Sequence, residues 1–302
     1  MKLPFRTLLC LTSGALFVLT LVVFCSAVQS TAKDSSARNI VEKGNAQDPH
    51  FQFQLALKYA RGEGVARDDA AAARLFRKSA EAGLAEAQVA FGFAYHLGRG
   101  IKQNDVEAVK WFRKAADHGL ASAEFNLGFA YFTGSGVQQS DTEAVTWFRK
   151  AAEQGFAPGE TNLAVMYARG LGVNRDFTEA VKWYRKAAQQ GDPDAQASLG
   201  ELCANGDGTT KDDREAVQWF RQAAEMGNVR AQTDLARMYE YGRGVSRDLT
   251  EAYKWFFLAA DAGDSEVAST LSDLSKRLTP AQIGEGKGRA NEWQIAHGRT
   301  LR

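Results

Sequence analysis

Side chains that could perform chemistry are few and scattered in this 302-residue chain. The four histidines do not have the spacing of metal ligands, and no cluster of His, Cys and Asp suggests a catalytic triad. Ser30 and Lys33 have the Ser-x-x-Lys spacing of penicillin-recognising serine enzymes, but the companion motifs are missing and chance explains the pair better. The residues therefore predict a protein that is not an enzyme and needs no metal and no cofactor. The histidines are His50, His96, His118 and His297.

A recurring Gly-x-Gly pair could in principle bind phosphate through backbone N–H groups. The pair lacks the third glycine and the preceding strand of a dinucleotide site, so we interpret its glycines as left-handed C-caps of helices. Acidic and basic residues also recur in every copy, which favours a solvated face over paired catalytic carboxylates. The pairs are Gly62/Gly64, Gly98/Gly100, Gly134/Gly136, Gly170/Gly172, Gly206/Gly208 and Gly242/Gly244.

A fixed period of 36 residues sets the elements that position these groups. One copy runs from 120 to 155, and a period of 20–50 residues is typical of a solenoid whose units stack on their neighbours. Within a unit we expect a first helix that ends at the paired glycine and a second helix that opens with a capping box, such as Asn104 with Glu107. A glycine within the first helix, such as Gly92, is expected to let two helix backbones approach closely. The aromatic pairs that mark the period are Leu75-Phe76, Trp111-Phe112, Trp147-Phe148, Trp183-Tyr184, Trp219-Phe220 and Trp255-Phe256.

The pattern A-x-x-x-L-G-x-x-Y-x-x-G-x-G-V-x-x-D-x-x-E-A-V-x-W-F-R-K-A-A-x-x-G resembles the Sel-one-like repeat, a relative of the tetratricopeptide repeat. The resemblance covers about residues 48–263 and implies an all-α, right-handed α-solenoid of about six 36-residue helix-turn-helix repeats. It also implies an adaptor that assembles protein complexes. Some bacterial members clip their repeats with disulfides and are linked to penicillin binding. A cell-wall-related hydrolase or penicillin-binding protein is therefore the alternative function.

The N-terminal residues 1–32 have the features of an export signal. Lys2 and Arg6 precede an uncharged, mostly apolar run, and cleavage after Ala27 or Ala32 fits the small residues there. The run could instead remain as an anchor in the inner membrane, with the repeats outside the cytoplasm. We therefore expect an exported, periplasmic or secreted protein, with residues 33–47 as a flexible tether. Cys203 is the one cysteine after this segment and is expected to be buried.

The charge balance and the C-terminal residues complete the expected organisation. The chain has 37 Lys and Arg against 36 Asp and Glu, which favours a protein or peptide partner over nucleic acid. A monomer is expected. Residues 264–302 are predicted to form a partial seventh repeat and a capping helix, with Thr279 as its N-cap and Pro280 in its first turn. Trp293 and Ile295 are expected to pack back on the repeats.

The first helices of the repeats carry the candidate binding residues, because positions that vary between copies are suited to recognising a partner. They are expected to line the concave face of the superhelix. One helical stripe is apolar in the first three repeats and polar in the last two, which predicts an apolar groove for a peptide or helix. A second, polar column one position later could bond an extended peptide. The alternative is that the aromatic side chains pack between neighbouring helices. The candidates are Phe53, Leu57, Val89, Phe93, Phe125, Phe129 and Val165 in the stripe, and Asn126 and Asn162 in the column.

Overall fold

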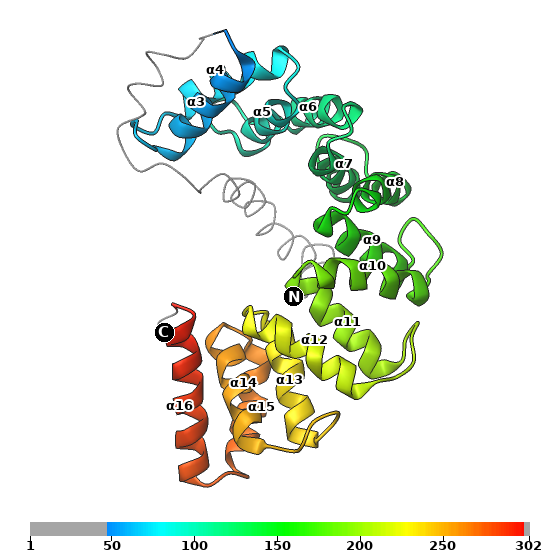
Figure 1. Ribbon diagram of the computed structural model, residues 1–302, viewed down its shortest axis with the longest axis vertical. Helices are drawn as coiled ribbons and strands as arrows, with labels where there is room; N and C mark the ends of the chain where they lie inside the picture. Colours follow the sequence, from blue (N-terminus) through cyan, green and yellow to red (C-terminus); the bar gives the residue numbers. More distant parts are fainter. Residues whose placement is uncertain (1–46, 299–302) are drawn as a thin grey trace. The chain divides into compact units, whose positions relative to one another are not determined.

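The computed structural model describes residues 47–298, in which the chain forms fourteen α-helices and no strand. The predicted signal and all but the last residue of the predicted tether lie outside the described residues. Twelve helices of 13 residues each form the six repeats, two helices to a repeat with a short turn between them (Figure 1). The first helices are α3 (Pro49–Arg61), α5 (Ala85–Leu97), α7 (Ala121–Thr133), α9 (Ala157–Arg169), α11 (Pro193–Asn205) and α13 (Val229–Tyr241). The second helices are α4 (Asp69–Glu81), α6 (Asp105–Asp117), α8 (Asp141–Glu153), α10 (Phe177–Gln189), α12 (Asp213–Glu225) and α14 (Leu249–Asp261).

The described chain divides into two compact units, α3 to α7 and α8 to α16, with the boundary after Ser140. Within each unit, the helices of the repeats pack against the next helix along the chain. Local packing of this kind defines a solenoid, so the prediction of an all-α solenoid of helix pairs is confirmed.

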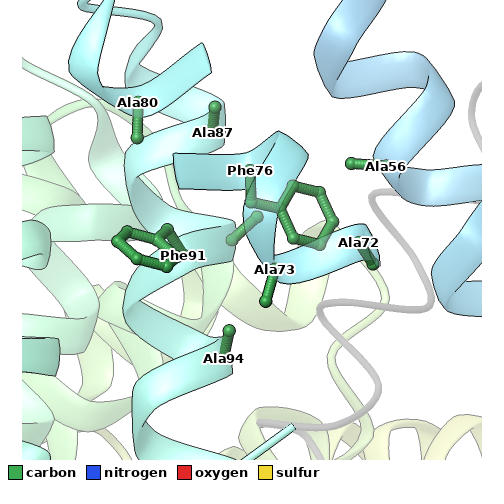
Figure 2. Packing of buried hydrophobic residues seen from close by; sticks show 9 residues of the cluster. Ala56, Ala72, Ala73, Phe76, Ala80, Ala87, Phe91 and Ala94 are labelled. Carbon is green, nitrogen blue, oxygen red and sulfur yellow. The ribbon is translucent and has the colours of Figure 1, made fainter. Parts of the chain in front are cut away.

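Alanine and phenylalanine form the core of the first unit. Phe76 of α4 lies among small side chains of α3, α4 and α5, as Figure 2 shows. Ala56 and Ala87 are fully buried, and Phe53 lies at the edge of the cluster with its ring 5.9 Å from that of Phe76. Small residues allow the helices to approach closely, and each aromatic ring fills the space that remains.

The starts of α4, α6, α10, α12 and α14 are fixed by their N-cap side chains. Asn104 accepts a hydrogen bond from the Glu107 backbone N–H at 3.2 Å, and Asp248 accepts one from Glu251 at 3.0 Å. The reciprocal half of the predicted capping box does not form in these two helices, because the backbone N–H of each N-cap donates instead to a tyrosine carbonyl, Asn104 to Tyr95 at 3.0 Å and Asp248 to Tyr239 at 3.1 Å. Glu107 pairs with Lys110, and Glu251 accepts from the Trp255 indole. These boxes are therefore only half correct as predictions.

The two glycines of each Gly-x-Gly pair have different roles. The first is the left-handed C-cap of its helix, as predicted, for example Gly98 with φ +65°. From the second repeat onward, the second glycine packs against the start of the second helix of the preceding repeat. A Cβ atom at Gly100 would lie 1.9 Å from the Asp69 carbonyl oxygen, and one at Gly244 would lie 2.1 Å from that of Asp213. Only glycine permits this contact between repeats.

The structure supports the expectation for Gly92 and adds an aromatic ring to it. A Cβ atom there would lie 2.6 Å from a ring carbon of Phe112, in the second helix of the same repeat. Gly200 meets Phe220 in the same way, at 2.7 Å. The Ala108 carbonyl oxygen of α6 would also lie 3.2 Å from the Cβ atom at Gly92, so this glycine makes room for an aromatic ring and for a helix backbone.

The last two helices, α15 (Ser265–Ser275) and α16 (Pro280–Ala296), end the array as predicted. Thr279 forms a complete capping box with Gln282. Trp293 packs edge-on against Trp255 at 6.2 Å and donates from Nε1 to Glu225 Oε2 at 2.6 Å. The expectation for Ile295 is wrong: it is 77% exposed, because two residues of helix turn it away from the face that carries Trp293. No helix within residues 47–298 is long and apolar enough to span a bilayer.

Candidate interaction surface

The predicted apolar residues of the first unit are mostly covered. Phe93 is 6% exposed, and its ring meets that of Phe112 edge-on at 5.2 Å. Phe125 is 3% exposed, with its ring 6.4 Å from that of Phe129. These values favour the packing alternative for Phe93 and Phe125. Val89 and Asn126 are buried as well, whereas Phe53, Leu57 and Phe129 are half-buried.

Two predicted residues lie in the second unit, on α9. Asn162 is buried, and its amide donates to the Pro158 carbonyl of the same helix at 2.9 Å. That bond satisfies one of its donors within the helix. Val165 is half-buried. Within each unit, then, the predicted residues differ in exposure, and the apolar groove stays a prediction.

Two hollows lie beside the helices. The first, between α5, α6 and α7, is lined by His96, Asp105, Asn126, Phe129 and Ser135 among others and has a volume of about 10 Å³. A space of that size holds one water molecule. His96 Nδ1 lies 2.7 Å from Asp105 Oδ1 at its edge.

The second hollow lies at the start of α14. Its volume is about 500 Å³, and it is open to solvent between the turn that precedes α14 and the first turn of α16. Asp248, the one carboxylate in its lining, already caps α14. The remaining side chains do not form a charged or nucleophilic centre. The lining includes Tyr239, Val245, Ser246, Arg247, Leu249, Thr250 and Gln282.

A continuous polar surface joins α11 and α13 in the second unit. The Arg230 guanidinium donates to Ser198 Oγ at 2.6 Å and lies 3.9 Å from Glu201 Oε2. Arg237 pairs with Asp234 at 3.3 Å. The side chains of Arg230, Glu201 and Arg237 are 52%, 56% and 56% exposed. We define the polar patch as Asp194, Ser198, Glu201, Arg230, Asp234 and Arg237.

The carboxylates of the polar patch are held in a partly desolvated setting. Burial raises the pKa of Asp194, against the attraction of Arg230 and a hydrogen bond from Asn228 at 2.7 Å. Burial likewise raises the pKa of Asp234, against the attraction of Arg237 and Arg230. Both arginines therefore help to keep these acids charged.

Sequence reasoning found part of the polar patch. The polar character of the last two repeats was predicted from the stripe and from the column, which contain Glu201, Arg237, Ser198 and Asp234. Asp194 and Arg230 were missed. They lie four residues before Ser198 and Asp234, on the same helix face, so a search at i−4 could have found them.

Cys203 takes a position that tyrosine holds in other repeats. At three of those tyrosines, an arginine from the second helix of the preceding repeat donates to the hydroxyl, as Arg221 does to Tyr239 at 2.8 Å. The arginine that would face Cys203 in this way is Arg185 of α10. It pairs instead with Glu215 at 2.6 Å. Cys203 is fully buried, as predicted, and burial raises the pKa of its thiol to about 11. A thiol in this setting is not a nucleophile at neutral pH.

The part of the chain that the structure describes contains no candidate metal site. No group of three or more His, Cys, Asp or Glu side chains there could hold an ion.

Comparison with solved structures gives two informative neighbours. A Sel1 repeat protein from Oxalobacter formigenes is 32% identical with a TM-score of 0.67, over 74% of this chain and 90% of that one. The protective antigen c5321 from uropathogenic Escherichia coli, which has the SLR fold, is 30% identical with a TM-score of 0.55. That match covers 84% of this chain and 62% of c5321. No curated protein matches the chain.

The Sel1 repeat family matches the chain six times in succession, one residue later than the predicted boundaries. Proteins of this family generally act as scaffolds for protein–protein interaction, and the match gives no support to the hydrolase alternative. The matched segments are 49–84, 85–120, 121–156, 157–192, 193–228 and 229–264. Because they cover well over half of its length and coincide with the six helix pairs, the chain belongs to the Sel1 repeat family.

Proposed function

We propose that this chain is an exported scaffold that binds a partner protein or peptide through the exposed faces of its first helices. The polar patch on α11 and α13 is the observation that carries the proposal. Glu201, Arg230 and Arg237 are exposed, and the patch is bonded across two repeats and mixes both signs of charge, which suits selective recognition of a protein surface.

Matched positions in α11 and α13 separate packing from recognition. Ala195 and Leu199 of α11 are fully buried, and so are the equivalent Ala231 and Leu235 of α13. The exposed positions differ instead, since Glu201 of α11 corresponds to Arg237 of α13. One packing code with a variable exposed face allows the scaffold to present a different surface from each repeat.

Three half-buried apolar side chains form a second proposed contact region in the first unit. Phe53, Leu57 and Phe129 keep part of their surface open to solvent. Partial exposure on the first helices suits them as secondary apolar anchors beside a polar contact.

Export rests on the N-terminal sequence, in which a basic start precedes an apolar run. Cell fractionation with an antibody against the repeats tests it, together with mass measurement of the mature N-terminus. A start at Val28 or Lys33 supports a cleaved signal, and an uncut chain in the inner membrane supports the anchored form. Cytoplasmic protein with residues 1–32 intact contradicts export.

Capture of a partner tests the scaffold. The repeats are used to capture proteins from periplasmic and membrane extracts, and affinity is then measured with the purified partner. Arg230→Glu with Arg237→Glu is expected to weaken binding at least tenfold, because both charges of the polar patch reverse. Lys211→Glu with Arg214→Glu, at exposed positions next to and on α12, is the matched control and should bind as the parent does. Equal loss in both proteins, or no loss in either, contradicts the assignment of the polar patch.

A further inference from the structure

A buried glutamine connects consecutive repeats at three junctions. Its side-chain amide donates to a carbonyl near the end of the preceding second helix, at 3.1–3.2 Å. Each of these carbonyls also accepts the N–H of the glycine three residues later, at 2.9–3.1 Å. The carbonyl therefore has two donors. The glutamine and alanine pairs are Gln88 with Ala80, Gln196 with Ala188, and Gln232 with Ala224.

Glu160 occupies the glutamine position in α9 and is 2% exposed. The equivalent carbonyl, that of Ala152 in α8, accepts the Gly155 N–H at 2.9 Å. A carboxylate has no hydrogen to give as the second donor, whereas a carboxylic acid has one. The junction is tight, because a Cβ atom at Gly159 would lie 2.8 Å from the Ala151 Cβ.

Glu160 has a neutral hydrogen-bond donor beside it but no buried counter-ion. Gln190, at the end of α10, donates from Nε2 to Glu160 Oε2 at 2.7 Å. Lys186 of α10 favours the charged form of Glu160, and Asp192 at the start of α11 opposes it. Burial is the largest effect, and it raises the pKa of Glu160.

We propose that Glu160 makes the packing of α8 and α9 sensitive to pH, because only its protonated carboxyl can donate to the Ala152 carbonyl as glutamine does at the sister junctions. The added hydrogen bond is fully present below the ordinary pKa of 4.5 and is lost as pH rises through the higher pKa of the folded protein. The scaffold then becomes firmer at this junction in acidic surroundings. Glu124 stands at the same position in α7 and is 6% exposed.

Thermal unfolding of the full chain tests the proposal with two variants. Glu160→Gln restores the sister residue, and Glu153→Gln removes the same charge at an exposed position of α8. At pH 7.5, Glu160→Gln should unfold about 2–4 °C above the parent. At pH 4.5 the two midpoints should coincide, while Glu153→Gln follows the parent at both pH values. Glu124 is unchanged in all three proteins, and no partner is needed for the measurement.

The carboxyl titration of Glu160, followed by carbon NMR and assigned by its loss in Glu160→Gln, gives a second readout. A midpoint above 4.5 supports the proposal. A midpoint at or below that value overturns it. So does a Glu160→Gln variant that gains no stability at pH 7.5, or that gains equally at both pH values.

Discussion

At some positions one repeat carries a residue that stabilises the fold less than the equivalent residue of another repeat does. Asp192 caps α11 by accepting the Ala195 backbone N–H at 2.7 Å, yet it is only 9% exposed. Burial raises the pKa of its carboxyl to about 6. One repeat later, Asn228 caps α13 through the same bond to Ala231 at 2.9 Å and carries no charge. The cap needs a side-chain oxygen but not an ionised one.

Asp192→Asn should therefore stabilise the second unit above pH 6. The folded pKa of Asp192 lies above its ordinary value of 3.8, so ionisation costs stability as pH rises through about 6. A gain of about 1–2 kcal/mol is expected at pH 8, and none at pH 3.5. Urea unfolding at the two pH values measures it. The exposed cap Asp212→Asn is the control, and a pH-dependent gain there would show that burial is not the cause.

Residue types predicted burial better than they predicted function. Cys203 was expected in the core and is fully buried there. Phe93 of α5 holds the same stripe position as Phe129 of α7, but the ring of Phe112 covers it. Helical periodicity gives the face of a residue, whereas the covering ring comes from the second helix of the repeat and depends on how the two helices pack.

The turn between the two helices of a repeat contains two glycines that have different structural roles. The C-cap role of the first glycine follows from local sequence, since a left-handed residue ends a helix. The packing contact of the second glycine could not be predicted from the neighbouring sequence, because the backbone that it contacts lies in the preceding repeat. Gly244, for example, meets Asp213.

Gly244→Ala should break the contact between the last two repeats. The new Cβ would lie 2.1 Å from the Asp213 carbonyl oxygen, in addition to the strain at φ +66°. Gly263→Ala isolates that strain, because its φ is +103° and nothing lies within 4 Å of its Cβ. We expect a loss of about 1 kcal/mol for Gly263→Ala and at least twice that for Gly244→Ala. Equal losses in chemical unfolding would mean that the turn relaxes away from the contact.

The whole molecule is stabilised by contacts between neighbours along the chain, in two compact units. Its end helices contribute little to a core. α3 buries only Ala56, and α15 buries only Val267 and Leu274, whereas α11 buries eight residues. The stability of such an array is a sum of repeats and junctions rather than a single cooperative core.

Amide hydrogen exchange, read by mass spectrometry, should follow this gradient. Peptides from α11 should exchange about a hundredfold more slowly than peptides from α3 and α15, since a difference of about 3 kcal/mol in local opening gives that ratio. Peptides from α9 provide an internal comparison within the second unit. Uniform protection from α3 to α15 would contradict independent repeats and indicate one cooperative unit.

The contact between the second glycine and the preceding repeat determines how the length of this protein can change. The contact is made with backbone atoms of the preceding repeat, and at Gly100 and Gly244 it meets residues of the same position in that repeat. Because this contact involves only backbone atoms, it does not depend on the side chains of the two repeats that it joins. Loss or duplication of one whole 36-residue repeat is therefore expected to preserve this glycine contact at every junction, whereas an insertion of another length between the two contacting segments would put a different residue at the glycine position.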